Sequence, residues 1–545
     1  MGTDDLFKKR RAERQKRKHE FKSVNTNSFL IVTEGEKTEP LYFKGLQKKI
    51  NEKVNGRIDI VESPVIDIFG QGCSTSRLIE ATEEIVKDSK VFYQNIWVVF
   101  DKDDFKDFDE AIRLGKEKGY KIVPFDAIAD IYIINTCTVT NIADRKSRQM
   151  LHRAKKQNPE AVVVAVGCYV QAGNEEVLKD LSIDLAVGNN KKKDLVPILE
   201  EFLAKREKTG AAGEETTEKT LHGKTLIDIG KTSEYEEMKL RQTAEHTRAF
   251  IKVQDGCNQF CSYCIIPYAR GRIRSRQKQE VLEEVKGLAA KNYREVVLTG
   301  IHLSSYGMTG GTDFSKSGLS ELIASVNEIS GISRIRLGSL EPRIITTEFL
   351  KRLSECDKLC PHFHLSLQSG CDTVLQRMNR KYSSGEYYEK VCMLREAFQD
   401  PAITTDVIVG FPGETEEEFE ATRAFLAKVG FYEMHLFKYS KRKGTPAAEM
   451  EGQIEEAVKA QRSGALALLE QEMSMKYRER HLQKPAEILF EEAKEINGKS
   501  YQIGHTREYI KGAVLTDQSL SGQVLYGKCT EFLSQDILAF EPERN

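Results

Sequence analysis

Short apolar runs alternate with helix-like segments along most of this 545-residue chain, and this alternation constrains the fold more than any other feature. In the amino-terminal part the apolar runs are FLIVT at 29–33, NIWVVF at 95–100, IADIYIINT at 128–136 and AVVVAVG at 161–167. Strands that alternate with helices usually pair in parallel within one sheet. This part of the chain therefore predicts parallel α/β structure.

Six strand-like runs in the second half predict a partial (β/α)6 barrel over residues 236–480. AFIKVQDG precedes a cysteine-rich loop, and the runs after the loop are REVVLTGIHL, SRIRLGSLEP, HFHLSLQSG, TTDVIVGFPGE and YEMHLFKYS. In such barrels the chemistry lies at the carboxyl ends of the strands. The polar segment 205–235 is predicted to be a linker, because it is rich in Gly and Thr and has few apolar anchors. Residues 481–545 carry shorter alternating runs, which are typical of a small β-barrel.

The near-zero net charge of the chain excludes nucleic-acid binding through overall positive charge. Lys and Arg number 82 and Asp and Glu number 83, so the net charge is −1. Any affinity for nucleic acid must therefore come from local basic patches. Residues 1–24 form one such patch, and they are either a solvated arm or an RNA contact. The sequence lacks the apolar run of about eighteen residues that a membrane span needs, and it lacks the apolar core of a secretory signal. We therefore expect a cytoplasmic protein.

The loop GCNQFCSYC at 256–264 holds three cysteines, Cys257, Cys261 and Cys264. One reading is a structural zinc site whose fourth ligand lies elsewhere in the chain. The other is a [4Fe–4S] cluster in which each thiolate binds one iron and one iron lacks a protein ligand. S-adenosylmethionine (SAM) could chelate that open iron, and electron transfer would then yield a 5′-deoxyadenosyl radical. The spacing and the surrounding βα repeat favour the cluster.

Residues 121–545 resemble the radical-SAM superfamily and, within it, the methylthiotransferases that modify tRNA. NTCTVTNIADRKSRQ and AVGCYVQ are similar to the family's amino-terminal domain, here 121–204, and GCNQFCSYCIIPYARGRIRSR is similar to the radical-SAM signature. LTGIHLSSYG, LGSLEP, HLSLQSG, RMNRKY and DVIVGFPGETEEEF are similar to later barrel motifs, and the tail resembles a TRAM domain, a small RNA-binding barrel. The segment NTCTVTNIADRKSR resembles the corresponding segment of the subgroup that converts N6-threonylcarbamoyladenosine at tRNA position 37 to its 2-methylthio derivative.

The resemblance implies roles for particular residues. Cys257, Cys261 and Cys264 would hold the cluster that generates the radical, and Cys137 and Cys168 would hold a second [4Fe–4S] cluster that carries the sulfur. A second SAM molecule would supply the methyl group, and a protein such as flavodoxin or ferredoxin would supply electrons. Strand-end residues that would contact SAM or substrate, or else satisfy loop backbone, are Thr299, Gly300, Glu341, Gln368, Ser369, Asp406 and Gly410. Residues that would contact tRNA, or else form a solvated face, are Arg270, Arg272, Arg274, Arg276, Arg507, Tyr509 and Lys511.

Residues 1–120 resemble the start of an RloB-type protein, a group linked to phage defence, instead of the methylthiotransferase amino terminus. The resemblance rests on FLIVTEGEKTEPLYFKGL, FGQGCSTSRLIEA and IWVVFDKDDFKDFDEAIRLGKEKG. Glu34, Asp101 and Asp103 follow strand-like runs and resemble a Toprim metal site for Mg²⁺, although such acids can also cap helices. The alternative function is therefore a Mg²⁺-dependent, nucleic-acid-acting defence module fused to an RNA-binding scaffold.

Because the RloB-like segment stands in place of the family's amino terminus, the chain lacks the strand on which the family carries the first ligand of the second cluster. Cys73 also follows a strand and precedes a helix, but it lies in the RloB-like part, 64 residues before Cys137. Either Cys73 completes the second cluster or the chain is a methylthiotransferase impaired by the loss of one ligand.

Overall fold

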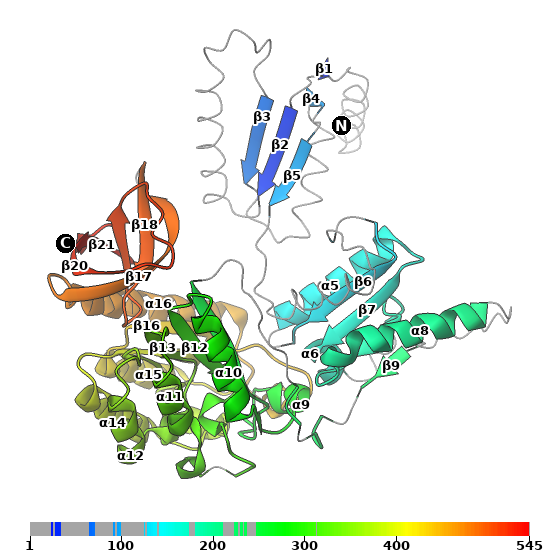
Figure 1. Ribbon diagram of the computed structural model, residues 1–545. Coiled ribbons are helices and arrows are strands. Elements are labelled where there is room, and N and C mark those ends of the chain that lie inside the picture. The colour runs from blue at the N-terminus through cyan, green and yellow to red at the C-terminus, as the bar shows by residue number, and fades with distance from the viewer. Residues whose placement is uncertain are drawn as a thin grey trace, which may run out of the picture. The chain divides into compact units, whose positions relative to one another are not determined.

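The computed structural model describes two units of the chain, residues 1–108 and 109–545, which are treated separately (Figure 1). The described residues are 23–24, 28–33, 65–70, 91–92, 95–99, 125, 128–138, 141–173, 180–210, 223–226, 229–232, 234–236, 247–311, 313–496 and 498–543.

The first unit contains a parallel sheet, as expected for its amino-terminal βα pattern. Strands β2 (Ser28–Thr33), β3 (Val65–Gly70) and β5 (Asn95–Val99) pair in the order β3-β2-β5, and β1 (Ser23–Val24) pairs in parallel with β4 (Val91–Phe92). Thr33 and Val99 are register partners, so β2 and β5 end side by side. The predicted metal ligands Glu34, Asp101 and Asp103, and the candidate cluster ligand Cys73, lie outside the described residues.

The second unit begins with a parallel sheet that has helices on both faces. Its strands are β6 (Ile131–Thr136), β7 (Val162–Gly167), β8 (Leu185–Val187) and β9 (Gly223–Thr225), in that order, and its helices are α5 (Asn141–Gln157), α6 (Cys168–Ala172), η1 (Lys192–Asp194) and α8 (Leu195–Gly210). Every residue of β7 is buried, and successive side chains pack on opposite faces. Val163 and Ala165 join Leu151 of α5 in one core, and Val164 joins Leu199 of α8 in another. The predicted linker 205–235 contains β9, which adds a fourth strand to this sheet.

Six parallel strands then form the predicted partial (β/α)6 barrel, which confirms this part of the fold. They are β10 (Arg248–Asp255), β12 (Glu295–Gly300), β13 (Arg334–Leu337), β14 (His362–His364), β15 (Ala402–Val409) and β16 (Glu433–Lys438). The strands pair in parallel as β10-β12-β13 and β14-β15-β16. Two isolated parallel bridges, Ile335 with Leu359 and Leu340 with Leu365, connect the two groups next to β14. Strand β11 (Arg274–Ser275) pairs antiparallel with the outer edge of β10.

The barrel helices cover the outside of these strands (Figure 1). They are α10 (Lys278–Ala289), α11 (Leu319–Asn327), α12 (Thr347–Ser354), α13 (Asp372–Arg377), α14 (Ser384–Ala397), α15 (Glu416–Val429) and α16 (Glu456–Glu479), with short turns η2 (Leu303–Ser305), η3 (Phe314–Lys316), η4 (Pro342–Ile344) and η5 (Pro446–Ala448). The short helix α9 (Ile266–Arg270) contacts α6 instead. Reciprocal capping boxes start α14 at Ser383 and Glu386 and α15 at Thr415 and Glu418. Apolar strand and helix side chains share one continuous core.

The carboxyl-terminal residues form the predicted small β-barrel. Strands β17 (Pro485–Ile496), β18 (Lys499–His505), β19 (Lys511–Leu515), β20 (Val524–Phe532) and β21 (Ile537–Pro542) close in the order β17-β18-β19-β21-β20. Its core includes Ile488, Phe490, Leu538 and Phe540. Among the helices in the described ranges, none combines the length and apolar character needed to cross a membrane.

A buried network of charges joins the small barrel to the amino ends of the large barrel's strands. Glu295 and Arg334, the first residues of β12 and β13, are both fully buried. Arg334 donates to Glu487 of β17 at 2.7 Å, and Arg336 donates to Glu295 at 3.0 Å and to the Arg507 carbonyl at 3.0 Å. Burial opposes the charge of Glu295, but the surrounding arginines outweigh it and lower its pKa to about 2. The small barrel therefore covers the amino ends of these strands.

Candidate cluster and substrate site

The three-cysteine loop leaves the carboxyl end of β10 through a backbone turn that only glycine can adopt without strain. Gly256 has φ of 72°, and a Cβ atom there would lie 1.8 Å from the carbonyl oxygen of Arg272. The amide of Cys257 donates to the Gly271 carbonyl at 3.0 Å, which holds the start of the loop against the segment after α9. This close approach fixes where the first thiol lies.

The far side of the loop is tied to the segment that follows α13. Ser262 donates through its amide to the Met378 carbonyl at 3.0 Å and through its hydroxyl to the Arg377 carbonyl at 2.8 Å. The side-chain amide of Asn379 donates to the Phe260 carbonyl at 2.8 Å, and Phe260 itself has φ of 50°. These bonds hold the middle of the loop in an extended arch, so that all three cysteines lie at one end of the barrel.

The thiols of the loop are buried close to one another. Burial raises the pKa of Cys257 to about 11 and that of Cys264 to about 12, and the neighbouring Cys261 adds to both increases. Arg380 donates to the Cys261 sulfur at 3.3 Å, and its positive charge lowers the pKa values of Cys257 and Cys264. Metal ions that bind this loop would displace the thiol protons, because a metal-bound cysteine is deprotonated.

The donor set of the loop fits a multinuclear cluster better than a structural zinc ion. A structural zinc site usually has four protein ligands, whereas Cys257, Cys261 and Cys264 supply three thiolates and residues 256–264 contain no histidine. Each thiolate can bind one iron of a [4Fe–4S] cluster, and one iron then stays free of protein ligands.

A buried glutamine locks the cysteine loop to the end of β12, where Thr299 and Gly300 were predicted to bind SAM or substrate. Gln254 donates at 2.7 Å to the carbonyls of both Asp255 and Gly256, and its side-chain oxygen accepts from the His302 amide at 2.6 Å. A Cβ at Gly300 would lie 2.9 Å from Gln254, so only glycine lets the two strand ends approach. Thr299 is half-buried beside this contact.

Glu341, at the end of β13, lies beside the same loop. Its carboxylate accepts from the Arg343 side chain at 2.6 Å, and Arg343 in turn donates to the Gln259 side chain at 3.1 Å. Burial raises the pKa of Glu341 even though Arg343 opposes that shift. Sequence reasoning missed Gln254, Arg343 and Arg380. Gln254 lies at the end of β10, where a polar residue was an available signal, whereas Arg343 lies in a short turn and Arg380 follows a helix.

The site residues predicted at the ends of β14 and β15 have different surroundings. Ser369 is fully buried, and its hydroxyl lies 3.1 Å from that of Thr422 in α15. Gln368 has φ of 76° and its amide donates to the Asp406 carbonyl at 2.9 Å. Asp406 lies within β15, not at its end, and Gly410 follows β15 with φ of 69° and its amide donating to Glu414.

An exposed aromatic ring that the sequence analysis did not single out also lies on β16. Phe437 is 48% exposed, whereas the alternate residues Met434 and Leu436 pack into the core between strands and helices. Side chains alternate along a strand, so Phe437 and His435 share the side away from that core, which is the barrel interior. An exposed ring in this position can stack on a bound base.

The two cysteines of the predicted second cluster lie at the ends of neighbouring parallel strands. Cys137 follows β6 and Cys168 begins α6 directly after β7. The Asn189 side chain donates to the Cys168 sulfur at 3.4 Å and to the Ala269 carbonyl of α9 at 2.7 Å. It therefore ties one cysteine to the helix that follows the first cysteine loop. The candidate third ligand, Cys73, lies outside the described residues.

A second contact holds the Cys137 segment against the barrel. Arg442, which follows β16 and is 6% exposed, donates to the backbone and hydroxyl of Thr138, to Asn141 at 3.0 Å and to Asp144 at 2.9 Å. The two sets of cysteines are thus held by side chains that cross between the sheet and the barrel.

The basic run after the cysteine loop, which was predicted to contact tRNA phosphates, is mostly internal. Arg274 is 2% exposed, because β11 pairs with β10 and directs it toward Asp255 at 3.4 Å. Arg276 is also buried and lies 2.5 Å from Glu284. Arg270 lies 3.7 Å from Asp255, whereas Arg272 is exposed over the Phe260 ring. Of the four, Arg272 has the position that suits RNA.

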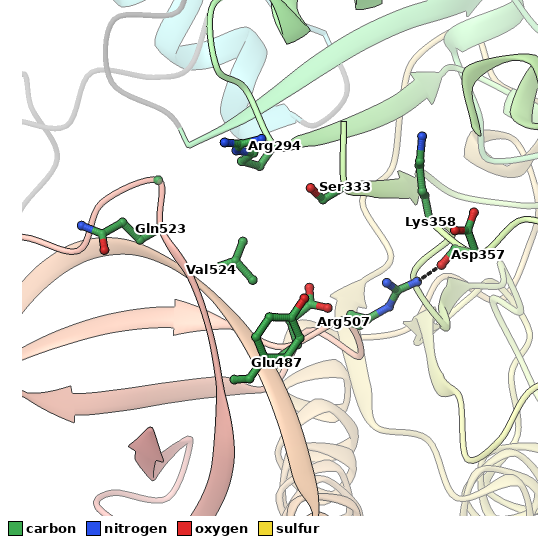
Figure 2. Close-up of a pocket in the computed structure, with 10 residues that line it drawn as sticks. Arg294, Ser333, Asp357, Lys358, Glu487, Arg507, Gln523 and Val524 are labelled. Atoms are coloured by element: carbon green, nitrogen blue, oxygen red, sulfur yellow. Dashed lines mark hydrogen bonds between the residues drawn. The ribbon is translucent and has the colours of Figure 1, made fainter. Parts of the chain in front are cut away.

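The residues of the small barrel that were predicted to contact RNA also divide. Tyr509 stacks on His505 with ring centroids 4.3 Å apart and lies under Arg248 and Arg336, so its ring is not free to stack on a base. Lys511 is exposed and pairs with Asp536 at 2.9 Å. Arg507 donates to the Asp357 carbonyl and lines a pocket of about 510 Å³ between the two barrels, together with Arg294 and Lys358 (Figure 2).

Three family matches cover most of the chain. Residues 251–426 match the Radical SAM superfamily, and residues 103–188 match the uncharacterized protein family UPF0004. Residues 29–125 match the RloB-like protein family, which agrees with the resemblance expected for the amino terminus.

Relatives of known activity share most of their length with this chain. It is 38% identical over 419 residues to the threonylcarbamoyladenosine tRNA methylthiotransferase MtaB of Bacillus subtilis (strain 168), covering 76% of this chain and 89% of that one. It is 41% identical over 386 residues to the enzyme of the same name from Aquifex aeolicus (strain VF5), covering 71% and 89%. It is 35% identical over 418 residues to a tRNA-2-methylthio-N(6)-dimethylallyladenosine synthase from Acetivibrio thermocellus, covering 75% and 82%. These similarities do not favour the Toprim-like alternative.

Proposed function

The chain belongs to the radical-SAM methylthiotransferases that act on tRNA, and from this premise we propose that its substrate is N6-threonylcarbamoyladenosine at position 37, which it methylthiolates at C2. The observation that carries the proposal is the 38% and 41% identity to two enzymes named for that substrate. The dimethylallyladenosine enzyme is 35% identical, so the substrate is the finer point that experiment must decide.

The cysteine loop is built for the chemistry that such enzymes require. A reduced [4Fe–4S] cluster held by Cys257, Cys261 and Cys264 supplies, when bound, the electron that cleaves SAM to a 5′-deoxyadenosyl radical. Arg380 stabilises the Cys261 thiolate, and Gln254 holds the loop against the end of β12. Phe437 in β16 offers an exposed ring on which the adenosine base would stack.

The second cysteine site predicts that SAM cleavage is more efficient than the insertion of sulfur into tRNA. Cys137 and Cys168 supply two thiolates, and the RloB-like match at residues 29–125 stands where the family carries the first ligand of this cluster. Two thiolates hold a cube less firmly than three. We therefore expect more 5′-deoxyadenosine than methylthiolated tRNA in each reaction. The reaction would take place in the cytoplasm, with electrons from a flavodoxin or ferredoxin.

Mass spectrometry of tRNA nucleosides tests the substrate. The chain is expressed in cells that lack their own methylthiotransferases, and the nucleosides are compared with those from cells that express Cys257→Ala. We expect the 2-methylthio derivative of threonylcarbamoyladenosine only with the unaltered chain. The 2-methylthio derivative of dimethylallyladenosine in its place would overturn the substrate proposal.

Iron analysis of the anaerobically reconstituted protein tests the clusters. About four irons per chain with little methylthio product would support the imbalance, because one cube holds four. About eight irons with equal amounts of 5′-deoxyadenosine and product would refute it, and the absence of iron would refute the enzyme itself.

A further inference from the structure

Three ligand-type side chains from consecutive strands meet on the inner face of the large barrel. His364 ends β14, Asp406 lies in β15 and His435 lies in β16. Asp406 and His435 are register partners, and His364 is the partner of Thr404, two residues before Asp406. Because side chains alternate along a strand, all three project from the same face. Their ligand atoms all lie within 4.8 Å of one another.

The geometry around His364 leaves one nitrogen directed at the group. The Nδ1 atom lies 3.0 Å from the Thr404 hydroxyl, which fixes the ring. The Nε2 atom lies 3.2 Å from Oδ2 of Asp406 but forms no hydrogen bond of acceptable geometry. His364 is 9% exposed, so this nitrogen is a buried polar atom without a partner, and such atoms are rare in folded proteins.

The second imidazole completes the group from the solvent side. The rings of His364 and His435 are stacked, with centroids 5.6 Å apart and an interplanar angle of 26°. Asp406 is half-buried and His435 is exposed, so the group is open toward the barrel interior. An ion can therefore reach it without a change in the fold.

A simple ion pair would explain the contact between His364 and Asp406, but it would not explain why a second imidazole lies beside them. His152 and Asp180 form such a pair at 3.0 Å on the protein surface. There the carboxylate also accepts from Ser182, and no second imidazole joins the pair within the described residues. At His364 the carboxylate, the unpartnered nitrogen and a second ring all converge on one point.

We propose that His364, Asp406 and His435 bind a divalent cation with the ligand preference of zinc. Two imidazole nitrogens and one carboxylate oxygen are a common ligand set for zinc, which would keep a fourth position open to an oxygen or nitrogen from a molecule inside the barrel. The Thr404 hydroxyl orients the first imidazole, as outer partners of metal ligands do. Asp406 then serves as a metal ligand, and the site does not depend on the identity of the tRNA substrate.

Zinc analysis of the holoenzyme tests the site. With iron bound to the cysteines, the protein is equilibrated with zinc, desalted and analysed by plasma mass spectrometry. We expect about one zinc per chain, and a loss of zinc affinity of at least about tenfold in His435→Asn. His435 is exposed, so this variant should fold, and an unchanged iron content and circular dichroism spectrum would show that it has done so.

His152→Asn is the matched control, because it removes a histidine from a comparable pair that lacks a third ligand. It should retain the zinc of the unaltered protein. Substituting cobalt(II) for zinc should give a spectrum without thiolate-to-cobalt charge transfer. Zinc below about a tenth of an equivalent in the unaltered holoenzyme, zinc retained by His435→Asn, or cobalt bound to thiolate would each overturn the proposal.

Discussion

Glu295→Gln should loosen the joint between the two barrels in a pH-dependent way. Glu295 is fully buried among Arg248, Arg334 and Arg336, and these arginines lower its pKa from 4.5 to about 2. A shift of that size corresponds to about 3 kcal/mol of stability at neutral pH. Glutamine keeps the shape of the side chain but leaves the arginines without their buried counter-charge. We therefore expect a loss of about 3 kcal/mol at pH 7.

The pH dependence follows from the sign of the shift. Because the folded pKa is lowered, the stabilising effect is complete above the unfolded value near 4.5 and is lost as the pH falls toward 2. The difference between the two proteins should therefore shrink by about 1 kcal/mol between pH 7 and pH 4.

Hydrogen exchange measures the effect where it occurs. Peptides that cover Arg334–Leu337 and residues 505–510 report the local opening of the joint. At pH 7, exchange there should be roughly 150-fold faster in the variant. Glu201→Gln is the control, because its partner Lys205 is exposed and no change is expected. Exchange accelerated by less than about fivefold, or an equal difference at pH 7 and pH 4, would refute the reasoning.

Three further predictions concern the cysteine sites. In Gly256→Ala the new methyl group would lie 1.8 Å from the Arg272 carbonyl oxygen, so iron retained after reconstitution should fall severalfold; unchanged iron and sulfide would contradict this. Arg442→Lys cannot reproduce the contacts with Thr138, so methylthio product should fall at least about tenfold while 5′-deoxyadenosine formation stays within about twofold. Equal losses of both products would argue against a positioning role for Arg442. In the iron-free protein the pKa of Cys264 is about 12, so its alkylation at pH 8 should be about a thousandfold slower than that of a free thiol. The rate should rise about tenfold for each pH unit, because the thiolate fraction rises by that factor. A rate that does not change with pH would contradict this prediction.

Periodic apolar patterns predicted the layers of the fold because each strand is buried on at least one face. The six strands of the large barrel and the closed small barrel follow the runs that the sequence shows. The cysteine loop was equally visible, because metal chemistry needs its ligands close together in the chain. The short strand β9 was not, since GKT has no apolar pattern and pairs with β8 only at long range.

Contacts between distant segments carried no local signal. Arg274 reads as one member of an alternating basic run, but the antiparallel pairing of β11 turns it inward onto Asp255. Tyr509 was predicted to stack on a base, but Arg248 and Arg336 lie over its ring. Both arginines come from strands far earlier in the chain, so the local sequence around Tyr509 does not indicate this contact. Arg442 lies 304 positions from Thr138, and neither residue predicts the other.

The side chains that dock the cysteine-bearing sheet onto the barrel all come after the point where the RloB-like match ends at residue 125. Thr138, Asn141 and Asp144 meet Arg442, and Asn189 meets the Ala269 carbonyl. Residues before 125 take no part in these four contacts. A different amino-terminal segment can therefore join the chain without breaking them, even where it changes the ligands of the second cluster.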